Sequence, residues 1–386
     1  MKKLTFTVLS MSVLTVMAGA AIAPALGIIG AHFAMQGVSE MTIKLIVSLP
    51  ALFIILTNLL FTHFANRFTT RTIALVGLFL YVAAGTGCFF ADSIILLLFL
   101  RALLGVSVGL LMPLSTGLLA YYFPPTQQAR LMGLSAAMNQ LGGVVATLIA
   151  GILADRFGWQ YAFLVYLLGL FVVVFVLLFL PSDSIGKNQS NNTRLLSSLR
   201  RFYPCIMEMF LLMLIFFIFP TNFAPMANRD AYLSGHHDLV TAIMAGLDLV
   251  ALMMGLLFGK MMHWSQRLTM YLFPTLFLLG YGCYCLSQSL LALLIGSLFV
   301  GMATGIGVPF INTVAGIKGG QNATATIMPL LSAALYLGQF LSPLVVTPLA
   351  QCLFPNWTAG AFAVGCLLSV LLLIQVFSSR KFHSLS

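Results

Sequence analysis

Long unbroken runs of apolar residues alternate with short polar segments along the whole chain. One such run, residues 161–181 (YAFLVYLLGLFVVVFVLLFLP), contains no charged side chain. A membrane-spanning helix needs about 20 mostly apolar residues. The strands of a membrane barrel would instead alternate apolar and polar positions. The pattern therefore predicts an all-α membrane protein.

The same pattern recurs often enough to predict twelve membrane-spanning helices. The predicted spans cover residues 5–29, 41–61, 72–91, 94–122, 130–153, 160–180, 205–226, 240–262, 268–288, 290–314, 324–349 and 357–378. The first span begins like a secretory signal peptide, with Lys2 and Lys3 before an apolar run that ends in Ala21-Ile22-Ala23. Because the apolar run continues to residue 29, we expect an uncleaved span.

Composition excludes a soluble fold. Of the 386 residues, 61% are hydrophobic and only 7% are charged, whereas a soluble domain carries about 25% charged residues. The formal net charge of +10 would suggest a nucleic-acid partner in a soluble protein. In a membrane protein basic residues determine topology, so we expect a lipid bilayer and no nucleic acid as the partner.

The basic residues are distributed very unevenly between the two sets of alternating loops. The set that includes the N-terminus holds 14 of the 18 basic residues: Lys2, Lys3, Arg67, Arg71, Arg130, Lys187, Arg194, Arg200, Arg201, Lys260, Arg267, Lys318, Arg380 and Lys381. The other set holds Arg156 and Arg229, while Lys44 and Arg101 lie inside spans. Basic loops stay on the cytoplasmic side, so we expect an even number of spans and both termini in the cytoplasm.

A polar segment, residues 182–204, lies near the middle of the chain and predicts a cytoplasmic linker between six-helix bundles at 1–181 and 205–386. The bundles repeat each other. A single offset of 196 residues relates the following pairs: Pro24 and Pro220, Gly105 and Gly301, Gly109 and Gly305, Pro113 and Pro309, Gly142 and Gly338. Internal repeats of this kind occur in secondary transporters, with the substrate site at the repeat interface.

The fourth predicted span, LFLRALLGVSVGLLMP at residues 98–113, carries Arg101 followed by Gly105, Gly109 and Pro113. This span, the two six-helix halves and the basic central loop together make the chain resemble the major facilitator superfamily. Residues 121–143 (YYFPPTQQARLMGLSAAMNQLGG) are similar to bacterial drug and metabolite exporters. The resemblance implies a proton-coupled transporter in the bacterial inner membrane.

Two family motifs are incomplete in this chain. The loop after the second span usually reads Gly-x-Leu-Ala-Asp-Arg-x-Gly-Arg. Here residues 62–71 keep Arg67 and Arg71 but lack the Gly and the Asp. The resemblance therefore does not extend to the ion pair of that loop. The antiporter signature of the fifth span ends here in Gly142-Gly143 without its proline, so the motif does not establish antiport.

Two charged residues inside predicted spans are the main candidates for function. A charge within a span is costly and usually faces protein or a water-filled cavity. Arg101 could take part in proton coupling or attract an anionic substrate; the alternative is a structural donor to neighbouring carbonyls. Asp248 is the only acidic residue deep in a span, and burial favours its neutral form, which suits a proton carrier. The alternative is a hydrogen-bonded structural acid.

Further candidates would line a cavity or pack helices together. The cavity candidates are Asn139, Gln140, Phe216, Phe217, Ser332, Tyr336 and Gln339. The polar members could instead form hydrogen bonds between helices. The stripe Gly105, Gly109, Pro113 and Gly117 recurs every four residues, and small residues let helices approach closely. We expect this stripe to serve packing and bending during transport.

The remaining polar groups predict no catalysis. The chain lacks a phosphate-binding loop and an HExxH motif, and its six cysteines show no metal-ligand spacing. We therefore expect neither metal nor cofactor, and read the outer-loop pair His236-His237 as a solvated loop. Glu208 is expected to reach the inner membrane interface or to pair with Arg200 or Arg201.

These features together predict a monomeric secondary transporter that works by alternating access. The predicted substrate is a small organic molecule, such as a drug-like compound or a siderophore. The resemblance to exporters implies that it is exported in exchange for protons. Uptake of a small nutrient is the alternative within this class. A polytopic membrane enzyme or a sensor remains the alternative from another class. An enzyme would need clustered acids and histidines, and a sensor would usually carry an appended soluble domain. We expect neither from this sequence.

Overall fold

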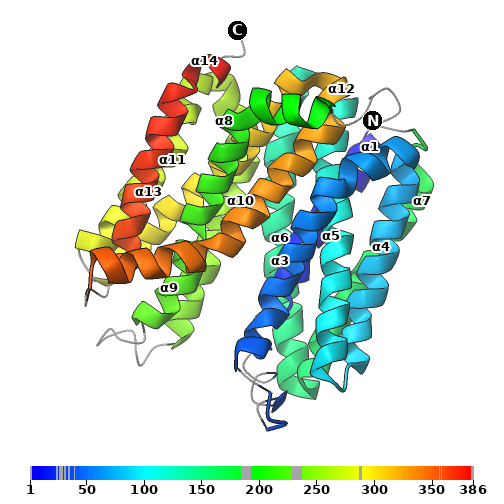
Figure 1. Ribbon diagram of the computed structural model, residues 1–386, viewed down its shortest axis with the longest axis horizontal. Helices are drawn as coiled ribbons and strands as arrows, with labels where there is room; N and C mark the ends of the chain where they lie inside the picture. Colours follow the sequence, from blue (N-terminus) through cyan, green and yellow to red (C-terminus); the bar gives the residue numbers. More distant parts are fainter. Residues whose placement is uncertain are drawn as a thin grey trace. The chain divides into compact units, whose positions relative to one another are not determined.

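A computed structural model gives the fold of the chain. It describes residues 2–383 except 23, 24, 26–28, 30, 31, 34, 39, 184–192, 228–236, 287, 288, 356 and 358. The described residues contain 12 helical segments that are long and apolar enough to cross a membrane. The predicted all-α class with twelve spans is thus confirmed (Figure 1).

The helices form two compact units, each built from three segments of the chain. The first unit comprises Met1–Pro124, Met138–Ser198 and Gly319–Ala333; the second comprises Pro125–Ala137, Leu199–Lys318 and Ala334–Ser386. The predicted division into bundles at residues 182–204 remains a prediction.

Helices and 3₁₀ segments (η) follow one another along the chain with few residues between them. The first half contains α1 (Lys2–Ala20), α3 (Glu40–Arg67), α4 (Thr70–Gly87), η1 (Cys88–Phe90), α5 (Ile94–Tyr122), α6 (Pro125–Phe157), η2 (Trp159–Leu168) and α7 (Gly169–Phe179). The second half contains α8 (Thr193–Phe216), α9 (Ile218–Ala227), α10 (His237–Trp264), α11 (Gln266–Leu286), α12 (Leu290–Leu353), α13 (Gly360–Ser378) and α14 (Arg380–His383).

Helix starts are marked by hydroxyl side chains in the short connections. Thr69, Ser93 and Ser289 precede α4, α5 and α12, and each accepts a hydrogen bond from a backbone N–H three residues later. The first N–H groups of a helix have no partner within it, so these hydroxyls stabilise the starts by about 1 kcal/mol each.

Some helix ends differ from the prediction. The first helix ends at Ala20 rather than at residue 29, although its apolar run continues. The helix of the seventh span begins at Thr193, twelve residues before the predicted start at 205. Hydropathy marks where a helix can enter lipid, whereas hydrogen bonding carries the helix on into the polar region. Spans 10 and 11 form the single run α12, which is broken only at Gly320 with φ +60°.

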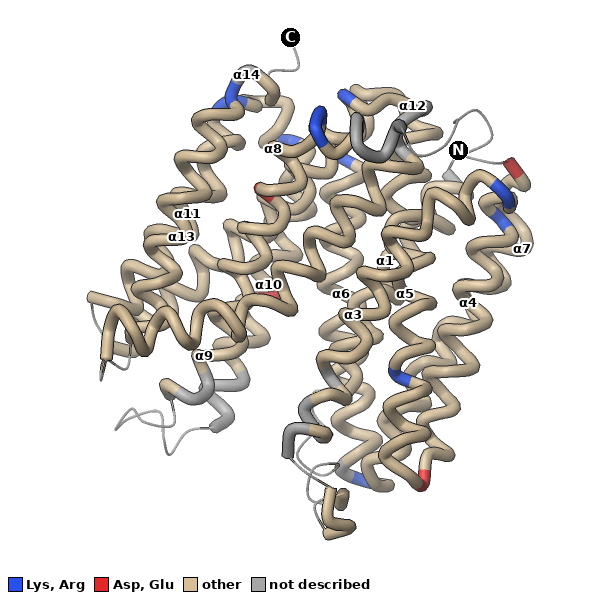
Figure 2. Tube along the Cα trace, in the orientation of Figure 1, with Lys and Arg blue, Asp and Glu red and all other residues tan. Residues whose placement is uncertain are grey.

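The outer surfaces of the helices are apolar. Phe79, Phe171 and Leu178 are among the large hydrophobic side chains that are exposed by two thirds or so. In water such surfaces would mark interaction sites, but on membrane-spanning helices they face lipid chains. Many basic residues lie at the helix ends near the N-terminus of the first unit and near the C-terminus of the second (Figure 2). Arg101 within α5 and Arg156 in the last turn of α6 are exceptions.

Helices in the first unit approach one another closely at glycines. A Cβ atom added at Gly142 of α6 would lie 2.1 Å from the carbonyl oxygen of Val13 in α1. A Cβ atom added at Gly105 of α5 would lie 2.5 Å from the carbonyl oxygen of Pro50 in α3. Both distances are too short for a real side chain, so these crossings require glycine.

The second unit has the same crossings, 196 residues later. A Cβ atom at Gly338 would lie 2.4 Å from the carbonyl oxygen of Phe210 in α8. One at Gly301 would lie 2.6 Å from the carbonyl oxygen of Leu247 in α10. The glycines paired by the sequence offset therefore make equivalent contacts in the two units. Pro24, the first member of another pair, lies outside the described residues.

We predict that Gly142→Ala and Gly338→Ala each destabilise the protein by about 1–3 kcal/mol, because the added methyl group overlaps a backbone carbonyl. The matched control is Gly246→Ala in α10, where nothing lies within 4 Å of an added Cβ atom. Alanine favours helix by up to about 1 kcal/mol over glycine, so this variant should keep or raise stability. Thermal unfolding in detergent measures both effects, and an unchanged melting temperature for Gly142→Ala would contradict the prediction.

Candidate functional site

Arg101 is completely buried and lies two turns after the start of α5. Its Nε donates to the carbonyl oxygen of Ile46 at 3.0 Å, and its Nη1 donates to that of Ala18 at 2.9 Å. Nη1 also donates to the hydroxyl of Tyr166 at 3.1 Å, and this hydroxyl donates in turn to Ala18 at 2.9 Å. One cation therefore ties α5 to three other elements: α1, α3 and η2.

The surroundings of Arg101 leave some polar atoms unsatisfied. Tyr81 packs edge-on against Tyr166, with ring centroids 5.4 Å apart. The hydroxyl of Tyr81 and the Nη2 of Arg101 are buried without a hydrogen-bond partner in the described part of the chain. No carboxylate among these residues forms an ion pair with Arg101. Two carbonyl oxygens and a phenol hydroxyl are the hydrogen-bond partners of the guanidinium.

Asp248 belongs to the second unit and lies on α10 within the span Ala242–Trp264. Its side chain is half-buried, so it is partly removed from solvent but remains reachable. Arg101 thus belongs to the first unit and Asp248 to the second.

Two of the predicted cavity residues have polar partners on other helices. Thr15 of α1 donates a hydrogen bond to Asn139 at 3.1 Å. The amide nitrogen of Asn58 in α3 donates to the hydroxyl of Ser332 at 2.8 Å. Within these pairs the side chains cross-link helices, which is one of the two roles expected for them.

The other predicted residues vary in exposure. Tyr336 is buried, whereas Gln140, Gln339, Phe216 and Phe217 are half-buried. Phe217 lies at the break between α8 and α9. Such partly exposed polar and aromatic groups can contact a ligand, since they are neither sealed in the core nor fully solvated.

The two arginines of the loop after the second span, Arg67 and Arg71, occupy different environments. Arg67 is exposed at the end of α3. Arg71 is half-exposed, and its guanidinium donates to the carbonyl oxygen of Leu177 in α7. Arg71 therefore tethers the start of α4 to the end of the sixth span.

Two further packing candidates lie at helix contacts of the first unit. Pro113 is buried within α5, and a Cβ atom added at Gly143 of α6 would lie 3.1 Å from Val16 in α1.

The expectation for Glu208 needs correction. Glu208 is fully buried and binds His383 and Ser379 rather than Arg200 or Arg201. The partner histidine lies 175 residues away in sequence, so neither periodicity nor local charge could indicate it. Within the described residues, no three potential ligands of the His, Cys, Asp or Glu type lie close enough to hold a metal ion.

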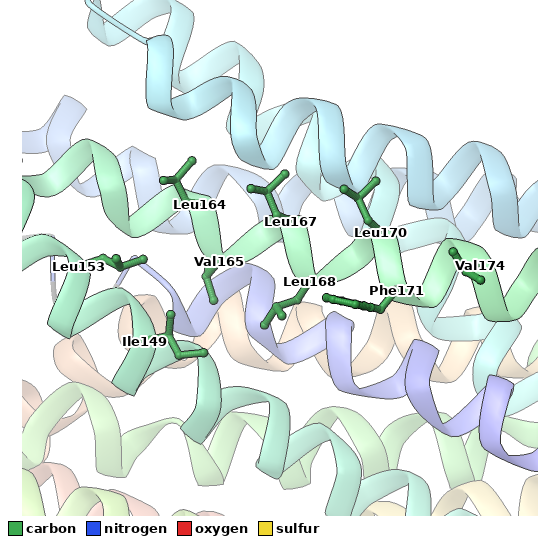
Figure 3. Close-up of a pocket in the computed structure, with 9 residues that line it drawn as sticks. All are labelled: Ile149, Leu153, Leu164, Val165, Leu167, Leu168, Leu170, Phe171 and Val174. Atoms are coloured by element: carbon green, nitrogen blue, oxygen red, sulfur yellow. The ribbon is translucent and has the colours of Figure 1, made fainter.

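An apolar groove of about 480 Å³ lies on the first unit between α6 and the sixth span. Figure 3 shows its lining: Ile149, Leu153, Leu164, Val165, Leu167, Leu168, Leu170, Phe171 and Val174. Phe171 and several neighbours are exposed at the lipid-facing surface. The groove lacks polar lining side chains that could orient a ligand, so it is no candidate for the substrate site.

The twelve apolar helical segments define a polytopic helical membrane protein. The family model of the Major Facilitator Superfamily matches residues 8–343. The chain belongs to this superfamily.

Curated relatives match only part of the chain. The niacin transporter NiaP of Acinetobacter baylyi is 32% identical over 101 residues, which are 26% of this chain and 23% of that protein. The multidrug transporter protein MdtP of Bacillus subtilis is 28% identical over 113 residues, or 29% of this chain and 21% of that protein. The aligned part thus spans less than a quarter of either relative.

Solved structures match over nearly the whole length. The proton:xylose symporter XylE, bound to 6-bromo-6-deoxy-D-glucose, superimposes with a TM-score of 0.81 at 14% identity. The match covers 99% of this chain and 95% of XylE. At this level of identity the likeness shows the fold, and the recognised family resemblance is confirmed by the family model.

We predict that Arg101→Lys lowers stability by about 1–3 kcal/mol, although the charge is kept. A lysine has one nitrogen and cannot serve the carbonyls of both Ala18 and Ile46 in the fixed geometry of a guanidinium, and a buried acceptor without its donor is destabilising. The matched control is Arg156→Lys, since Arg156 is exposed and surface changes stay within about 0.5 kcal/mol. Thermal unfolding in detergent distinguishes them, and equal melting temperatures would refute a structural role for the guanidinium.

Proposed function

We propose that the protein exports a small organic molecule in exchange for protons by alternating access. The observation that carries this proposal is Asp248, a half-buried carboxyl group within a membrane span of a major facilitator superfamily member. A secondary transporter that uses a proton gradient needs a group that can gain and lose a proton within the membrane region. Export is supported by the partial similarity to the multidrug transporter MdtP.

The charge distribution restricts the proposed substrate. Only 7% of the residues are charged, and Arg101 already donates to two carbonyl oxygens and a phenol. A highly charged substrate such as a sugar phosphate would need several more cations. The arrangement therefore favours a neutral or singly charged, largely apolar molecule such as a drug-like compound or a siderophore.

The test uses proteoliposomes with an imposed pH gradient and a panel of drug-like compounds. We expect the wild-type protein to move at least one compound against its concentration gradient, driven by protons flowing the other way. Asp248→Asn should lower this uphill flux by about tenfold or more, since an amide cannot carry a proton. Downhill exchange of the same compound should persist.

Asp92→Asn is the matched control, because Asp92 is exposed in the connection before α5. This variant should transport like the wild type. Proton coupling through Asp248 is refuted if Asp248→Asn keeps uphill transport at the wild-type rate. Export of drug-like compounds is refuted if no compound in the panel moves.

Uptake of a small nutrient is the second candidate function. It is favoured by the partial similarity to the niacin transporter NiaP. Including niacin and related small acids in the same assay distinguishes the two candidates. Symport would move the compound in the direction of proton flow, and antiport would move it the opposite way.

We further predict that both termini lie in the cytoplasm of a bacterial inner membrane, as the basic loops favour. Reporter tags inserted at residue 190 and after residue 386 should both report the cytoplasm. A tag inserted just after α6, next to Arg156 in its last turn, should report the periplasm. Periplasmic signals from the tags at residue 190 and after residue 386 would contradict the proposed topology.

A further inference from the structure

A buried acid–base pair joins helix α14 to helix α8 within the second unit. Glu208 is completely buried and His383 is 1% exposed. The Nε2 of His383 lies 2.9 Å from the Oε2 of Glu208. The hydroxyl of Ser379 lies 2.7 Å from the other carboxyl oxygen, Oε1. This pair is separate from Arg101 and Asp248.

Hydrogen-bond geometry determines how many protons the pair holds. The Nδ1 of His383 lies 2.9 Å from the backbone carbonyl oxygen of Ser379. A carbonyl oxygen only accepts, so Nδ1 must carry a proton. The Nε2 of a neutral ring is then an acceptor, and it faces a carboxyl oxygen. A hydrogen bond there requires one more proton, carried either by the imidazole or by Glu208.

Packing around the pair keeps this proton away from solvent. The ring of Phe310 stacks on His383 with centroids 5.7 Å apart, and the side-chain amide of Gln266 donates to the backbone carbonyl of His383. Phe382 packs edge-on against Phe202 of α8, also at 5.7 Å. Without the proton, two lone pairs and a net negative charge would face each other in this apolar setting, which is strongly unfavourable.

The other charged groups near the pair lie on its rim. Lys318 of α12 has its Nζ 5.1 Å from the ring centre of Phe382. Arg201 lies over Phe202, and Arg380 lies over Phe377. Cys205, one turn before Glu208, is buried; the side chain of Lys381 lies outside the described residues. None of these groups forms an ion pair with Glu208 within the described part of the chain.

We propose that Glu208 and His383 form a proton-binding site that docks helix α14 onto α8, so that docking takes up one proton. When the helix is released, the exposed carboxylate is ionised at neutral pH and an exposed histidine is mostly neutral above about pH 7. The docked pair then holds one proton more than the released pair. Docking is therefore favoured at low pH and weakens as the pH rises, by up to about tenfold per pH unit. The site does not depend on the proposed substrate or direction of transport.

The experiment measures hydrogen–deuterium exchange of the full-length protein in lipid nanodiscs from pH 5.5 to 9. After correction for the intrinsic exchange rate, the protection factor of peptides covering α14 reports the docking equilibrium. We expect protection in the wild type to be nearly constant below about pH 6 and to fall above about pH 7, approaching tenfold per pH unit.

Two variants replace the shared proton by a permanent N–H donor. In Glu208→Gln the amide can donate to the neutral imidazole, and in His383→Gln the amide can donate to the carboxylate. Both should keep α14 docked at neutral pH and flatten the dependence of protection on pH. A purely structural contact would instead lose protection equally at every pH.

The matched control is His263→Gln, because His263 is exposed on α10, and its profile should follow the wild type. The proposal is overturned if wild-type protection stays constant across the range, or if both glutamine variants keep the wild-type slope. Should Glu208→Gln fail to fold, the slope of His383→Gln alone decides between the two outcomes.

Discussion

Close backbone approach at helix crossings is the constraint on which both units depend. In lipid, apolar side chains gain little by associating, because the solvent is as apolar as they are. Contact must come from fitted surfaces, and here glycines let one helix touch the backbone of the next. Gly142 against Val13 and Gly338 against Phe210 show that both units use this device at equivalent positions.

Much of this fold could be predicted from sequence because lipid imposes a simple pattern. The twelve spans followed from hydropathy, and the 196-residue offset identified glycines that make matching contacts. Helix ends were less predictable: α8 begins in a polar region where hydropathy carries no signal. The pair of Glu208 and His383 was missed because only the fold brings residues so distant in sequence together.

The sequence could define only part of the environment of Arg101. A buried arginine was expected to need partners, but their identity as carbonyl oxygens of Ala18 and Ile46 depends on three helices meeting. This arrangement neutralises the cost of burial by dipoles instead of by an acid. Among the described residues, carbonyl oxygens and the hydroxyl of Tyr166 therefore take the place of a carboxylate partner for Arg101.

The division of each unit into three chain segments bears on the order in which the protein can be assembled. The first unit includes Gly319–Ala333, which is synthesised only after most of the second unit. The second unit in turn includes Pro125–Ala137 from early in the chain. Domains usually fold one after another as they leave the ribosome. In this protein neither unit has all its parts until α12 has entered the membrane, so completion of the two units is coupled during biosynthesis.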